Sequence, residues 1–174
     1  MRGGLAQALA SGAMLVLMLG ACGDDPDPAK SSSALSSAKE RVESRFRDAV
    51  DVLAGAGFEV ADADAEWRMC GVDPSPSMQV LGGGRLTGGE GDVAARVAAA
   101  ADALESAGWK VENAGETPRP YAVLADGEGA ERVQLSVTES RRTPGRIGLQ
   151  VGGACIESAT EDSNERMGQK FTLL

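Results

Sequence analysis

The chain has 174 residues, 43% of them hydrophobic, a formal net charge of −9 and no histidine. An acidic protein repels phosphate backbones, so nucleic acid and polyanionic polymers are disfavoured as partners. The lack of histidine removes the usual general base of serine and cysteine nucleophiles and the commonest zinc ligand. No cofactor and no metal ion is expected.

The first 22 residues carry the most specific motif. Arg2 precedes an apolar run over residues 13–19, which is too short to span a bilayer stably but is long enough for an export signal. Small residues then stand directly before a cysteine, as Leu-Gly-Ala-Cys at positions 19–22. This tetrapeptide resembles the lipobox of bacterial lipoproteins.

The chain as a whole, with more arginine than lysine and abundant alanine and glycine, resembles a small actinobacterial membrane-anchored lipoprotein. The resemblance implies that residues 1–21 are a cleaved signal peptide and that Cys22 receives a diacylglycerol thioether. The protein would then be lipid-anchored at the extracytoplasmic face of the cell membrane. The alternative is an ordinary secretory signal that leaves Cys22 as a free thiol.

Three segments are expected in the mature chain. Residues 22–36 are rich in aspartate, proline and serine and predict a flexible tether. Residues 37–156 are long enough for one domain with a single core. Residues 157–174 are polar and aperiodic and predict a loose tail.

Two amphipathic helices are predicted, over residues 37–55 and 92–107. Their apolar residues recur at steps of three and four, as Val42, Phe46, Ala49, Val50 and Leu53 in the first and Val93, Val97, Ala100, Ala101 and Leu104 in the second. In both segments a glycine, an aromatic residue and an extended stretch follow the helix. Internal duplication and chance similarity between alanine-rich helices both account for this match.

Strands are predicted over residues 65–72, 78–86, 121–125, 131–139 and 146–151. Apolar and polar residues alternate in the last two, which is typical of an antiparallel strand with one buried face. The predicted fold class is therefore α+β, with an antiparallel sheet and two amphipathic helices packed on one face.

Lipidation of Cys22 would leave Cys70 and Cys155 as one pair. Both lie at or near predicted strand ends, and an exported protein meets an oxidising compartment, so a structural disulfide is expected. A catalytic dithiol or a metal pair is disfavoured, because the first needs close spacing and the second needs more ligands.

Two further motifs do not meet the requirements of a binding site. The glycine-rich stretch over residues 82–91 lacks the Gly-Lys-Ser/Thr of a phosphate loop, and a bulged strand end with a flexible helix entry is the preferred interpretation. Asp62, Asp64 and Glu66 alternate, but they lack the spacing of a calcium loop and predict a solvated acidic edge.

Possible partner contacts come from two residue types. Arg141, Arg142 and Arg146 flank a Thr-Pro-Gly turn and could contact an acidic partner or lipid headgroups, although the tip of a solvated hairpin is the simpler interpretation. Trp67 and Trp109 would serve as anchors of a binding face if exposed, and as core residues otherwise.

The function expected from these features is a non-enzymatic binding or protein-interaction module at the cell surface, with a possible membrane-proximal protein partner. One alternative is a cell-envelope hydrolase that uses paired carboxylates, which needs a pocket lined by converging acids. The other is a small-ligand carrier, which needs an apolar cavity between the helices and the sheet.

Overall fold

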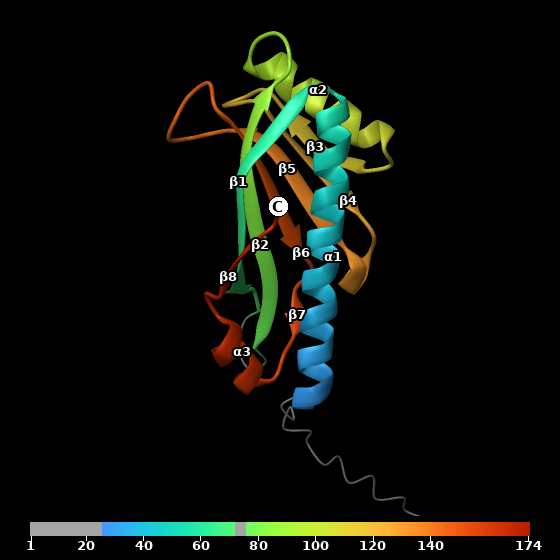
Figure 1. Cartoon of the computed structure of the whole chain (residues 1–174), viewed down its shortest axis with the longest axis vertical. Coiled ribbons are helices and arrows are strands. Elements are labelled where there is room, and N and C mark those ends of the chain that lie inside the picture. The colour runs from blue at the N-terminus through green and yellow to red at the C-terminus, as the bar shows by residue number, and fades with distance from the viewer. Residues whose placement is uncertain (1–25, 72–75) are drawn as a thin grey trace, which may run out of the picture.

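A computed structural model describes residues 26–71 and 76–174 of the chain (Figure 1). It contains one eight-stranded antiparallel sheet with the order β3-β4-β5-β6-β2-β1-β8, in which the short β7 pairs with the start of β2. Helices α1 (Pro28–Gly55) and α2 (Val93–Ser106) pack together on one face of the sheet. The predicted α+β class is confirmed.

Several strands differ from their predicted bounds. The strand predicted over residues 65–72 begins at Phe58 and ends at Met69, and the one predicted over residues 131–139 begins at Val133. The bounds of the strands are β1 Phe58–Met69, β2 Ser77–Gly88, β3 Lys110–Gly115, β4 Tyr121–Asp126, β5 Val133–Glu139, β6 Ile147–Gly153, β7 Ile156–Glu157 and β8 Lys170–Thr172. A short 3-10 helix, Gly129–Glu131, precedes β5, and a third α-helix, α3 (Thr160–Arg166), lies between β7 and β8.

The core lies between the two helices and the sheet. Helix α1 buries a stripe that repeats every three or four residues, formed by Leu35, Ala38, Val42, Phe46, Ala49 and Leu53. The strands contribute the alternate residues that point toward the helices, among them Trp67, Val80, Leu124, Leu135, Val137, Ile147, Leu149 and Val151. These side chains form one continuous cluster, so the domain has a single core.

The predicted tether is wrong for its second half, because α1 begins at Pro28 and not at Ser37. Asp27 caps the helix by accepting a hydrogen bond from the Lys30 amide at 3.1 Å, and proline at the first helical position needs no amide donor. The serines that follow are accommodated by tertiary contacts, since the Oγ of the buried Ser31 accepts from the Ala159 amide at 2.9 Å.

The predicted loose tail is also wrong. Helix α3 packs against the beginning of α1, as Figure 1 shows at the lower end of the molecule, and Arg166 donates to Ser32 Oγ at 3.1 Å. Strand β8 then adds to the edge of β1, and the side chain of Leu173 is only 2% exposed. Residues 157–174 therefore complete the sheet and the core.

The expected disulfide is confirmed, with Cys70 bonded to Cys155 across 85 residues of sequence. It joins the end of β1 to the segment between β6 and β7. The signal peptide over residues 1–21 and the lipidation site Cys22 lie outside the described residues. Within the described part of the chain, no helix is long and apolar enough to cross a membrane.

The two helix–hairpin units resemble each other in local geometry as well as in sequence. A glycine of positive φ stands two residues after the end of each helix, Gly57 at 84° and Gly108 at 100°, and the aromatic residue that follows, Phe58 or Trp109, is buried. The first strand of each hairpin also carries a β-bulge soon after that aromatic. The match therefore goes beyond similar composition of the two helices.

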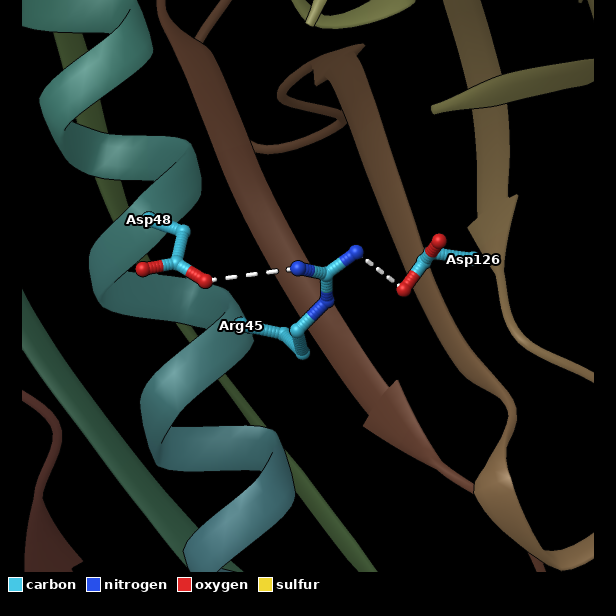
Figure 2. Close-up of polar contacts among 3 residues, drawn as sticks. All are labelled: Arg45, Asp48 and Asp126. Atoms are coloured by element: carbon cyan, nitrogen blue, oxygen red, sulfur yellow. Dashed lines mark hydrogen bonds and ion pairs between the residues drawn. The ribbon is translucent and has the colours of Figure 1, made fainter. Parts of the chain in front are cut away.

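One arginine of each helix links the two units, and Arg45 lies as many residues before Gly57 as Arg96 lies before Gly108. Arg45 of α1 forms ion pairs with Asp126, the last residue of β4, and with Asp48 at 3.4 Å (Figure 2), and its guanidinium lies 5.5 Å from the centroid of the Trp109 ring. Arg96 of α2 donates to the carbonyl of Gly88, the last residue of β2, at 2.7 Å. Each unit thus holds the end of the other unit's hairpin.

Candidate functional site

Among the residues that the structure describes, no helix covers the face of the sheet opposite to α1 and α2. Because side chains alternate along a strand, burial of one set of residues under α1 and α2 leaves the other set in contact with solvent. We call this surface the bare face and define it by Gln79, Leu81, Arg85, Tyr121, Val123, Gln134, Ser136, Thr138 and Gln150. Most of these residues are polar, as expected for a solvated sheet face.

A groove of about 690 Å³ runs over β4, β5 and β6 on the bare face. That volume lies within the range of roughly 300–1,000 Å³ that is typical of small-molecule sites. We call it the arginine groove, since three arginines line it together with polar residues: Arg119, Arg141, Arg142, Tyr121, Ser136, Thr138 and Gln150.

Within the described part of the chain the arginines of the groove form no ion pair, whereas the two arginines on the β1–β2 side of the bare face each pair with a carboxylate. Arg85 pairs with Asp62 at 2.9 Å, and Arg68 pairs with Glu66 at 2.5 Å. Among the residues that the structure describes, no carboxylate lies within ion-pair distance of Arg119, Arg141 or Arg142. With three arginines and the one carboxylate of Glu139, the lining of the groove carries an excess of positive charge on a protein of negative net charge.

Hydrogen bonds close the turn between β5 and β6, which carries Arg141 and Arg142. Glu139 Oε1 accepts a hydrogen bond from the Gly145 amide at 2.7 Å, and the Ser140 amide donates to the Arg146 carbonyl at 2.7 Å. Gly145 adopts a φ of 85°, which suits glycine. Glu139, the one carboxylate in the lining of the groove, is thus engaged by backbone.

The other wall comes from the loop between β3 and β4 and from the start of β4. Tyr121 Oη donates to Asn113 Oδ1 at 3.2 Å, and a side chain at Gly115 would bring its Cβ to 3.0 Å from Tyr121 Cε1. Gly115 therefore lets the tyrosine ring lie against β3. Arg119 Nε is buried and has no hydrogen-bond partner among the described residues.

A second groove, of about 520 Å³, adjoins the first across β6 and is lined by Arg146 and by the glycines at positions 82–84. These glycines lie within β2 and not at a helix entry. A Cβ at Gly82 would approach Ala65 Cβ to 2.6 Å, and one at Gly83 would approach the Leu149 carbonyl oxygen to 2.3 Å. Close packing against the neighbouring strands β1 and β6 therefore explains the glycines at positions 82–84. The predicted strand end and helix entry are wrong for these three glycines, because β2 continues to Gly88 and the bulge lies on β1.

The predicted partner contacts separate into two groups. Arg141, Arg142 and Arg146 are exposed at the β5–β6 turn, the position expected from sequence. Trp67 and Trp109 are 1% and 4% exposed, so of the two alternatives the core position applies and neither ring is available as an anchor for a partner. Both rings belong to the hydrophobic core cluster.

Sequence reasoning missed Arg119, Tyr121 and Gln150 as groove residues. For Gln150 and Tyr121 a signal was available, because each stands next to an apolar residue of a predicted strand and therefore faces the opposite side of the sheet. Arg119 had no such signal, because it lies in a loop.

The acidic residues of the bare face do not converge. Asp62 and Glu66 each face an arginine, and Glu139 accepts from a backbone amide. Over residues 26–71 and 76–174 no cluster of three or more histidine, cysteine, aspartate or glutamate side chains could hold a metal ion. The arginine groove therefore offers hydrogen-bonding groups and positive charge.

Comparison of the chain with protein family models, with curated proteins and with solved structures finds no match.

Proposed function

We propose that the protein is a membrane-anchored extracytoplasmic lipoprotein that acts as a non-enzymatic binding module, and that the arginine groove of the bare face binds its ligand. The observation that carries this proposal is the set of three unpaired arginines around a groove of about 690 Å³. Unpaired cations beside polar hydrogen-bonding side chains suit an anionic ligand.

The length of the linker supports attachment close to the bilayer. Five residues separate Cys22 from Pro28, the first residue of α1, and an extended chain of that length spans at most about 20 Å. Helix α1 is 28 residues long and rises by about 42 Å. Figure 1 shows the β5–β6 turn at the end of the molecule opposite to the start of α1, so the groove would lie away from the lipid.

The two alternative functions have less support. A hydrolase that uses paired carboxylates would need two converging acids, and the grooves of the bare face offer single acids that already have partners. A carrier with a cavity between the helices and the sheet would need space that large buried side chains occupy, such as Phe46, Trp67 and Leu104.

The membrane anchor predicts a specific result for Cys22→Ser. The wild-type chain expressed in a host that processes lipoproteins should sediment with membranes and incorporate a palmitate analogue, since Cys22 carries the acyl chains. Cys22→Ser should remain unlabelled and enter the soluble fraction. A wild-type chain whose mature N-terminus, by mass spectrometry, is not a lipidated Cys22 would contradict the anchor.

The binding surface predicts a difference in accessibility between two introduced cysteines. Gln150→Cys lies on the bare face and Asp51→Cys on the exposed side of α1. If a ligand occupies the groove in intact cells, a maleimide should label Gln150→Cys about tenfold more slowly there than on the purified protein. Labelling of Asp51→Cys should be the same in both settings. Equal labelling of Gln150→Cys in cells and in solution would refute the proposed surface.

A further inference from the structure

We infer that the ligand of the arginine groove is a short acidic saccharide, a carbohydrate of a few sugar units that carries carboxylates. This inference rests on the proposed function, because it assumes that the bare face is the binding surface. It adds the chemical class of the ligand, which follows from three properties of the groove.

The first property is that the strands beneath the groove offer their side chains, and not their backbone, to the ligand. Strand β4 pairs with β3 and β5, and β5 pairs with β4 and β6, so the backbone amides and carbonyls beneath the groove are engaged in the sheet. A bound polypeptide usually adds to a sheet edge through main-chain hydrogen bonds, and these cannot form over the middle of a sheet. A ligand recognised through side chains is therefore favoured.

The second property is the mixture of groups that the groove presents. Ser136, Thr138 and Gln150 carry hydroxyl and amide groups that both donate and accept hydrogen bonds. Tyr121 adds an aromatic ring that is only partly buried and is held against β3. Sugar hydroxyls need partners of both kinds, and the apolar faces of sugar rings can pack on an aromatic ring.

The third property is the local charge. Arg119, Arg141 and Arg142 offer planar guanidinium groups, which bind carboxylates through two parallel hydrogen bonds. The net charge of −9 opposes a long polyanion, because the acidic surface beyond the groove would repel it. A ligand with few charges, short enough to stay within the groove, can bind the arginines and avoid repulsion by the acidic surface.

The test is isothermal titration calorimetry of the full folded domain with three probes of similar size. Trigalacturonate carries three carboxylates on sugars, triglutamate with an acetylated N-terminus and an amidated C-terminus carries the same number on a peptide, and maltotriose is an uncharged sugar. We expect trigalacturonate to bind about tenfold or more tightly than either of the others, since only it matches both the charge and the hydroxyl groups.

The arginines are tested by Arg141→Ala combined with Arg142→Ala, both at exposed positions where the fold should survive. This double variant should lose about tenfold or more in affinity for trigalacturonate. The matched control combines Lys30→Ala with Arg47→Ala, which removes two exposed cations from α1 and should leave the affinity unchanged. Circular dichroism checks that both variants fold as the wild type does.

Two results would overturn the inference. Equal affinity for triglutamate and trigalacturonate would show that charge alone is recognised, and absence of trigalacturonate binding to the wild type would exclude this class of saccharide. Slow maleimide labelling of Gln150→Cys in cells, together with either result, would leave the proposed binding surface standing and reject only the ligand class.

Discussion

Replacing Cys70 and Cys155 together by serine lowers the free energy of unfolding by about 4–5 kcal/mol at 25 °C, since the bond closes a loop of 85 residues. The loss arises from the unfolded chain, whose conformational entropy increases when the loop is opened. Urea unfolding of the wild type and of the double variant, followed by circular dichroism, measures the difference.

A reduced wild type is the control for this experiment. In the presence of a strong reductant it should unfold at the same urea concentration as the double variant, because both then lack the covalent link between β1 and the segment after β6. A loss below about 1 kcal/mol would mean that the unfolded chain stays compact without the bond or that the folded chain is strained by it.

Leu173→Ala lowers the free energy of unfolding by about 2–5 kcal/mol, the usual cost of truncating a buried leucine. Leu173 is 2% exposed within the core cluster, and its amide donates to the Ala63 carbonyl at 2.9 Å. The substitution removes methyl groups from the core but keeps this hydrogen bond, so the loss reports on packing of the C-terminal residues.

The neighbouring Leu174→Ala is the matched control. Leu174 is 51% exposed, so its truncation should change the free energy of unfolding by no more than about 0.5 kcal/mol. Thermal and urea unfolding of the two variants measure the contrast. Equal effects of the two substitutions would contradict the docking of residues 170–174 on the sheet.

Local patterns in the sequence were sufficient for the main elements. The three- and four-residue spacing from Val42 to Leu53 predicted the buried face of α1, and alternation predicted which residues of β5 and β6 face the core. These predictions succeed because helix and strand periodicity depends on residues close together in the chain. The disulfide was also predictable, since only two cysteines remain once Cys22 is assigned to the lipid.

The ends of the domain could not be predicted in this way. The serine-rich start of α1 is polar and has only Leu35 as a fully buried apolar side chain, so by itself it predicts a tether. It is helical because α3 supplies hydrogen-bond partners such as the Ala159 amide for Ser31. Residues 157–174 are held in place by the same contacts. Neither this segment nor the start of α1 has enough apolar residues to predict its structure without the other.

The sequence by itself determined the α+β class, the buried faces of α1 and α2, the faces of β5 and β6 and the pairing of Cys70 with Cys155. The tertiary structure decided the burial of the two tryptophans and the composition of the arginine groove. Arg119 and Tyr121 meet Arg141 and Arg142 because β4, β5 and β6 are neighbours in the sheet. Contacts of this kind depend on strand order, which short-range periodicity does not encode.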